Sequence, residues 1–128
     1  MTDPTVTIRA IYDAFARGDI ATVLGALDPK IEWVEAAGSA YAGTYTGPDA
    51  VLSGVLARLA DEWNPFHVAP DRIVADRDTV IVVGTYTGTH NASGRSVRAR
   101  FAHVWELRDS NIIAFEQIAD TAKINEAT

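Results

Sequence analysis

A single histidine lies among aromatic residues in the run FAHVW, residues 101–105. With the two-residue period of a β-strand, His103 shares one face with Phe101 and Trp105. An imidazole titrates near neutral pH, so His103 could exchange a proton or hold a ligand in a pocket. It could equally be a core histidine whose ring nitrogens are bonded to neighbouring groups. The run alone leaves both interpretations open.

A carboxylate, Asp120, follows the strand-like run IIAFEQIA, which comes directly after a short turn. If the two runs pair antiparallel about a turn near residues 109–110, His103 lies opposite about residues 115–117, roughly 7–13 Å from Asp120. An aspartate partly removed from water can act as a general base with a raised pKa. The following sequence, TAKINEAT, supports an alternative in which Asp120 is the N-cap of a terminal helical turn.

A second carboxylate lies in the run IEWVEA, where Trp33 and Glu35 share a strand face. A carboxylic acid beside a tryptophan on an inward face would have a raised pKa. The alternative is a glutamate at a strand end that reaches solvent. The hydroxyls of Tyr41, Tyr45 and Tyr86 could donate a hydrogen bond to a carbonyl or an oxyanion. Each of these tyrosines could also simply pack at the edge of the core.

Three amphipathic helices are predicted in the first half of the chain, before the strands that carry these groups. Apolar residues recur in each at the helical spacing i, i+3, i+4 and i+7, and the apolar stripe of the third ends with Trp63. Asp, Gly and Pro mark the expected boundaries. The helices are expected to begin at Asp3-Pro4, Asp19 and Gly47-Pro48, and to end at Gly18, Asp28-Pro29 and Asn64-Pro65.

Beyond residue 65 the apolar period becomes that of strands joined by short turns, which favours antiparallel pairing. After the earlier strand in IEWVEA, strands are predicted at 66–76, 79–90, 95–107 and 112–120. The last is partly apolar on both faces, as a sheet covered on both sides or a β-bulge would produce. The loop AGSAYAGTYTG, which follows IEWVEA, could be a lid over a pocket or a long connection.

Helices followed by antiparallel strands indicate an α+β fold, and 128 residues suit one domain. We expect a single domain spanning 1–128, in which a curved antiparallel sheet wraps around the N-terminal helices. This arrangement would form a cone with an internal pocket. Ala102 and Val104 lie on the outward face of the strand that carries His103, where they suit either a subunit interface or an ordinary surface.

Composition argues against several classes of function. The net charge of −6 disfavours nucleic acid and membrane surfaces as partners. The absence of cysteine excludes disulfides and thiolate chemistry. His67, His90 and His103 lack metal-ligand spacing, so we expect no metal. Neither a leader sequence nor an apolar run of membrane-spanning length is evident, and the expected location is the cytoplasm.

Several motifs in order resemble SnoaL-like domains of the nuclear-transport-factor-2-like (NTF2-like, cystatin-like) superfamily, related to ketosteroid isomerases and polyketide cyclases. They are IYDAFARGDI, IEWVEAAG, YAGTYTGPDAV, FAHVWELRDSNI and FEQIADTAKI. The resemblance implies a cone with a deep pocket and a homodimer formed through the sheet. It also implies a general acid/base at Asp120, a pocket histidine at His103, and aromatic walls at Trp33 and Trp105. The three-part ketosteroid-isomerase site cannot be placed in full on this sequence.

We therefore expect a pocket for a small apolar ligand or substrate, with no cofactor. In the enzymatic interpretation, Asp120 moves a proton and His103 assists, in an isomerase- or cyclase-type reaction. The residues expected to contact the ligand are Trp33, Glu35, Tyr45, Phe101, Trp105, Phe115 and Ile118. The alternative is a non-catalytic ligand-binding or dimerisation module of the same fold. A protein-transport adaptor would need an exposed apolar groove, which the sequence does not indicate.

Overall fold

The N-terminal helices form where the sequence predicts them. The computed structural model describes residues 3–128, so the first two residues of the predicted domain 1–128 lie outside the described residues. Helix α1 (Pro4–Ala16) begins after Asp3, whose carboxylate accepts the N–H of Thr5. Helix α2 (Ile20–Gly25) is capped by Asp19 in the same way and is shorter than expected. None of the helices in residues 3–128 is both long and apolar enough to cross a lipid bilayer.

The third predicted helix is divided, and it ends before Trp63. It consists of α3 (Pro48–Val51), a π-helical turn (Leu52–Leu56) and α4 (Ala57–Glu62). Trp63 was predicted to close the helical stripe, but its backbone is extended and it is the first residue of strand β3 (Trp63–Asp76). The proline at position 65 explains the early end, since it cannot continue a helix and favours an extended residue before it.

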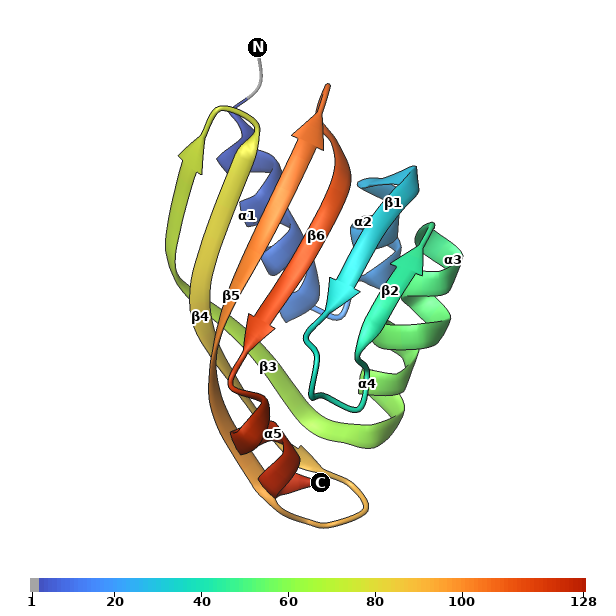
Figure 1. Cartoon of the computed structure of the whole chain (residues 1–128), viewed down its shortest axis with the longest axis vertical. Helices are drawn as coiled ribbons and strands as arrows, with labels where there is room; N and C mark the ends of the chain where they lie inside the picture. Colours follow the sequence, from blue (N-terminus) through green and yellow to red (C-terminus); the bar gives the residue numbers. More distant parts are fainter. Residues whose placement is uncertain (1–2) are drawn as a thin grey trace.

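Six strands form one curved, unclosed sheet in the order β2-β1-β6-β5-β4-β3 (Figure 1). Besides β3, the strands are β1 (Leu27–Glu35), β2 (Gly43–Thr46), β4 (Thr79–His90), β5 (Ser96–Arg108) and β6 (Asn111–Ala119). The α+β architecture agrees with the prediction. The short strand β2 lies in a segment predicted to be a loop.

All neighbouring strands pair antiparallel except β1 and β6, which run parallel. The prediction of antiparallel pairing rested on short turns, and no short turn joins β1 to β6, so their direction was not constrained by that argument. Of the two alternatives for the last strand, the structure shows a bulge: Glu106 pairs with Ala114 but Leu107 pairs with Ile112, which leaves one residue of β6 unpaired. Ile112 and Phe115 can therefore both face the core.

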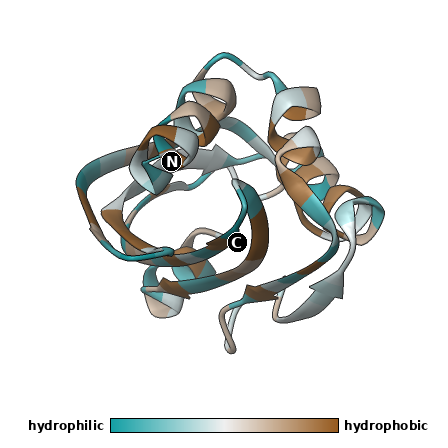
Figure 2. Cartoon of the chain, turned by 90° about the horizontal axis from the view of Figure 1, so that it is seen from above, coloured by the Kyte–Doolittle hydropathy of each residue, from teal (hydrophilic) through white to brown (hydrophobic). Residues whose placement is uncertain are grey.

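The sheet curls around an interior that the helices cover from one side (Figure 2). Helix α1 packs against β3 and β4, α3 packs against β1, and the last helix, α5 (Thr121–Ala127), packs against β5 (Figure 1). Two glycines of β4 permit the close approach of β3. A Cβ added at Gly84 would lie 2.3 Å from the carbonyl oxygen of Ala69 and 2.6 Å from the Phe101 ring. At Gly88 it would lie 2.6 Å from the carbonyl oxygen of Pro65.

Replacing Gly84 by alanine should therefore lower the free energy of unfolding by about 1–3 kcal/mol, because backbone and a packed ring must move apart. Gly25→Ala is the matched control, since its added Cβ meets nothing within 4 Å. Urea denaturation of the three proteins measures the effect. A Gly84→Ala variant as stable as the control would show that the curvature does not depend on this contact.

Candidate active site

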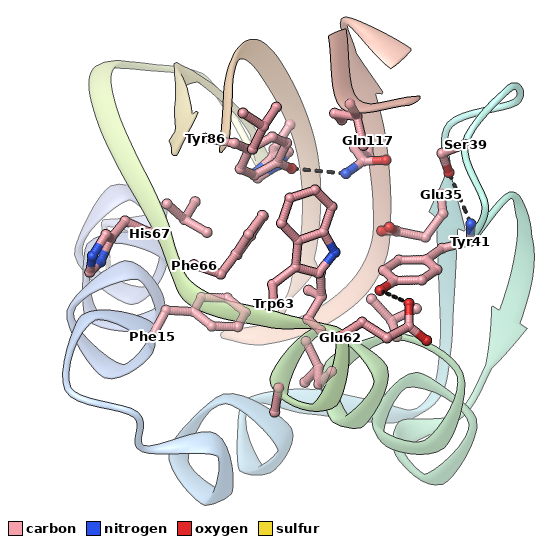
Figure 3. Close-up of a pocket in the computed structure, with 18 of the residues that line it drawn as sticks. Phe15, Glu35, Ser39, Tyr41, Glu62, Trp63, Phe66, His67, Tyr86 and Gln117 are labelled. Atoms are coloured by element: carbon pink, nitrogen blue, oxygen red, sulfur yellow. Dashed lines mark hydrogen bonds between the residues drawn. The ribbon is translucent and has the colours of Figure 1, made fainter. Parts of the chain in front are cut away.

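A cavity of about 460 Å³ lies between the inner face of the sheet, α4, α5 and the loop that follows β1 (Figure 3). Its walls are largely apolar and rich in aromatic side chains. Polar side chains reach it from strands β1, β3, β4, β5 and β6 and from the rim. The aromatic lining residues are Phe15, Trp33, Tyr41, Trp63, Phe66, Tyr86, Trp105 and Phe115. A volume of this size suits a small organic molecule.

One carboxylate is buried in this cavity wall. Glu35 is the last residue of β1 and only 5% exposed. The indole N–H of Trp33, two residues earlier on the same face, donates a hydrogen bond to Oε2 at 2.8 Å. The other oxygen, Oε1, has no hydrogen-bond partner among residues 3–128. Burial raises the pKa of Glu35 to about 7, since desolvation disfavours the charged carboxylate.

His103 is buried between two tyrosine hydroxyls. Tyr12 Oη lies 2.6 Å from Nδ1 and Tyr86 Oη lies 2.5 Å from Nε2. Each hydroxyl has a further partner, because Trp105 Nε1 donates to Tyr12 at 3.0 Å and Gln117 Nε2 donates to Tyr86 at 2.9 Å. Burial lowers the pKa of His103 to about 3, so the ring is neutral at ordinary pH. Burial also raises the pKa of both tyrosines.

Strand register places the acid and the histidine on one inner surface. Gln117 pairs with His103 across β5 and β6, and Val34 pairs with Glu116 across β1 and β6, so Glu35 is level with Gln117. Neighbouring strands lie about 4.8 Å apart, which separates the Cα atoms of Glu35 and His103 by roughly 10 Å. Gln117 stands between them, and its Oε1 accepts the backbone N–H of Ala36 at 3.1 Å.

The rim of the cavity is built from other elements. The Tyr41 hydroxyl donates to Glu62 Oε1 at 2.7 Å, and the guanidinium of Arg58 lies 4.2 Å from the centre of the Tyr41 ring. Asn125 of α5 donates to the carbonyl oxygen of Gly38 at 2.8 Å, which joins the last helix to the loop after β1. The rim is therefore held together by side-chain contacts between segments that are distant in sequence.

The structure places Asp120 outside this cavity. It is exposed, and it is not among the described residues that line the cavity. Its carboxylate is the N-cap of α5 and accepts the N–H of Lys123 at 3.3 Å. The geometry thus corresponds to the capping alternative, because the chain leaves the sheet at this residue to begin a helix. The position gives no support to the predicted acid/base role.

The other predicted residues divide between the cavity and its surroundings. His103 lines the cavity, as do four of the expected contact residues: Trp33, Glu35, Trp105 and Phe115. Phe101 stacks behind the histidine ring, with centroids 4.1 Å apart. Tyr45 donates to the Tyr41 carbonyl oxygen and packs against Gly54, outside the cavity. Ile118 is 53% exposed on the opposite face of the sheet.

Sequence reasoning did not assign a role to Tyr12 or Gln117. Tyr12 belongs to the apolar stripe of α1 and lies 91 residues from the histidine it contacts, so spacing gives no sign of the pair. Gln117 lies opposite His103 in the predicted register, and its inward parity was the one available signal. Among residues 3–128, no group of three His, Asp or Glu side chains is arranged to hold a metal ion.

The chain belongs to the SnoaL-like domain family, whose model matches residues 8–115. An NTF2-like protein from Burkholderia thailandensis is 38% identical over 99% of this chain and 98% of its own, with a TM-score of 0.95. An NTF2-like protein of unknown function from Burkholderia pseudomallei is 30% identical over 99% of this chain and 98% of its own, with a TM-score of 0.91. TerC, co-crystallised with polyporic acid, is 28% identical over 98% of each chain, with a TM-score of 0.87. No curated protein matches the chain.

The raised pKa of Glu35 predicts a pH-dependent loss of stability. The folded chain binds more protons than the unfolded chain between the ordinary pKa of 4.5 and about 7, so the free energy of unfolding falls as pH rises through this window. Glu35→Gln keeps an acceptor for Trp33 and removes the titration. The free energy of unfolding of the variant minus that of the wild type should therefore increase by on the order of 3 kcal/mol from about pH 4 to about pH 8.5.

Urea denaturation of both proteins at the two pH values measures this difference. Contributions from all other titrating groups cancel in the comparison, because the two proteins share them. A stability difference that does not change with pH would mean that Glu35 has an ordinary pKa and that its carboxylate is hydrated.

Proposed function

We propose that the cavity binds a small apolar molecule with a carbonyl group and that Glu35 transfers a proton at the carbon next to that carbonyl. The observation that carries the proposal is a 5% exposed carboxylate in the cavity wall, with one oxygen bound to an indole and the other unpaired among residues 3–128. A carboxylate with a pKa near 7 is suited to accept a proton and return it at physiological pH.

The proposed reaction uses the two polar sites of the inner surface. The Glu35 carboxylate takes a proton from carbon, and the electrons of the C–H bond form an enolate whose charge lies on the carbonyl oxygen. The Tyr86 hydroxyl, which lies in the cavity wall, donates a hydrogen bond to that oxygen. Protonated Glu35 then returns its proton to the same or another carbon, which gives exchange or isomerisation without a cofactor.

The relatives support a small organic ligand. The chain belongs to the SnoaL-like family, and TerC, a relative of the same fold, was co-crystallised with polyporic acid. The aromatic walls provide the apolar contact area that such a ligand needs. The non-catalytic alternative keeps the same cavity and ligand class but has no proton transfer, so the two functions differ in a measurable reaction.

The probe for this reaction is 2-tetralone, a bicyclic ketone with acidic hydrogens beside its carbonyl. We expect the protein to accelerate exchange of these hydrogens in D₂O, followed by proton NMR, with a rate that rises through about pH 7 as Glu35 ionises. Glu35→Gln should lower the protein-dependent rate by at least about 100-fold, which is the usual contribution of a general base.

Asp120→Asn is the matched comparison, because asparagine retains the capping oxygen and removes the carboxylate. We expect it to exchange 2-tetralone at the wild-type rate. If Asp120→Asn abolished exchange and Glu35→Gln did not, the acid/base residue would be Asp120, as the sequence predicted. Binding without exchange in the wild type would favour the non-catalytic module.

We also propose that two copies associate through the outer face of the sheet. Ile81 and Ile118 are 39% and 53% exposed there, and the half-buried Ala102 and Val104 lie on the strand between them. The pairs Ile81–Val104 and Ala102–Ile118 thus place apolar side chains across three neighbouring strands, as is common at subunit interfaces.

Ile81→Glu should convert the proposed dimer to a monomer, because it places a charge in an apolar contact. Val6→Glu is the control, since Val6 is an exposed apolar residue on α1, away from this face. Sedimentation equilibrium measures the molar mass of each protein. A monomeric wild type, or an unchanged mass for Ile81→Glu, would rule out this interface.

A further inference from the structure

The hydrogen bonds around His103 leave one donor proton without a partner. A neutral imidazole has one N–H and one lone pair, so it accepts from one group and donates to another. Its two neighbours are both hydroxyls, Tyr12 at Nδ1 and Tyr86 at Nε2. One tyrosine proton is therefore used by the ring. The other tyrosine accepts the ring N–H, and its own proton needs an acceptor elsewhere.

The remaining partners of the two hydroxyls cannot accept that proton. The indole of Trp105 only donates. The side-chain amide of Gln117 has its orientation fixed, because its Oε1 accepts the N–H of Ala36 and its NH₂ group therefore faces Tyr86. Turning the amide over would bring two N–H groups together at Ala36. Both tyrosine oxygens thus already accept one N–H each.

Two arrangements satisfy both ring nitrogens of His103. They differ in which tyrosine hydroxyl, here called the spare hydroxyl, keeps a proton that has no acceptor in the network. With the ring proton on Nδ1, the spare hydroxyl is that of Tyr12, which is 3% exposed and is not among the described residues that line the cavity. With the ring proton on Nε2, the spare hydroxyl is that of Tyr86, which lines the cavity (Figure 3). A buried, unpaired hydroxyl is costly, whereas one at a cavity can meet water or a ligand.

We propose that His103 carries its proton on Nε2, that Tyr12 donates to Nδ1, and that the Tyr86 hydroxyl proton is thereby directed into the cavity toward an acceptor oxygen of the ligand. Tyr12 is then a positioning residue, which acts on the ligand only through His103. We refer to Tyr12, His103 and Tyr86 as the tyrosine relay. The inference rests on the proposed function for the identity of the ligand as a carbonyl compound.

The tyrosine relay also determines which ligands the cavity should bind more tightly. The spare proton is a donor, so a ligand with an unprotonated oxygen at this position should bind better than a hydrocarbon of the same shape. Tetralin differs from 2-tetralone only in lacking the carbonyl oxygen, so the ratio of their dissociation constants isolates this contact. The ratio is independent of proton transfer by Glu35, because neither binding measurement requires a reaction.

The first test needs no substitution. Long-range ¹H–¹⁵N correlation spectra of the ¹⁵N-labelled protein distinguish the two neutral tautomers of a histidine. We expect the unligated protein at about pH 7 to show His103 protonated on Nε2, since burial keeps the ring neutral there. Protonation on Nδ1 would overturn the proposal.

The second test uses Tyr12→Phe and Tyr86→Phe, with binding of both probes measured by tryptophan fluorescence. The wild type should bind 2-tetralone about tenfold more tightly than tetralin, as one hydrogen bond provides. Tyr86→Phe should remove this preference. Tyr12→Phe should weaken this preference and allow the Nδ1-protonated tautomer to be populated, because no hydroxyl then donates to Nδ1 and Tyr86 can donate to Nε2 instead.

Tyr45→Phe is the matched control, since it removes a tyrosine hydroxyl that lies outside the cavity and the relay. It should keep the ketone preference and the Nε2 tautomer. A Tyr12→Phe protein that retains both would show that Tyr12 is merely structural, and no ketone preference in the wild type would show that Tyr86 does not donate to the ligand. If the preference and the tautomer are as expected but 2-tetralone does not exchange, the proposed proton transfer fails and the relay stands.

Discussion

A buried imidazole must remain neutral and must satisfy both of its ring nitrogens, and much of the interior is arranged around that constraint. His103 lies in the middle of the long strand β5, and its partners come from the first helix and from β4. Those partners are held in turn by groups on β5 and β6. The network therefore fixes the position of α1 against the sheet as well as the polar centre of the cavity. Polar networks of this kind rigidify a core, and here both ring nitrogens are satisfied within the network.

The same physical cause acts on the acid and the histidine but in opposite directions. Burial disfavours the charged form of each group, so it raises the pKa of Glu35 and lowers that of His103. The two groups do not form an ion pair, which would have stabilised both charges. Near neutral pH, one inner surface therefore carries a histidine that stays neutral and a carboxylate that titrates. Such divergent pKa values in one cavity are characteristic of acid/base sites.

Local patterns predicted the parts of this molecule that depend on neighbouring residues in the chain. Strand alternation placed His103 on an inward face and put Trp33 and Glu35 on one face, but it left open whether Glu35 reaches solvent. The mixed parity of the last strand was compatible with the observed bulge and equally with a sheet covered on both sides. Contacts between distant segments could not be obtained in this way. Tyr12 was indistinguishable from any aromatic residue in a helical stripe, and the parallel pairing of β1 with β6 has no local signal. Asp120 had two roles compatible with the sequence, and only the path of the chain into α5 separates them.

The division between the relay and the rim has an evolutionary consequence. Each residue of the relay is bonded to others on different elements, so a single substitution there leaves another buried polar group without its partner. The rim is made of a loop, α4 and α5, where Tyr41, Glu62 and Asn125 contact one another's segments without touching His103. Changes at the rim can alter the size and polarity of the entrance while the buried polar network is kept. Descendants of this chain would therefore diverge at the rim first, with the three relay residues inherited as a unit.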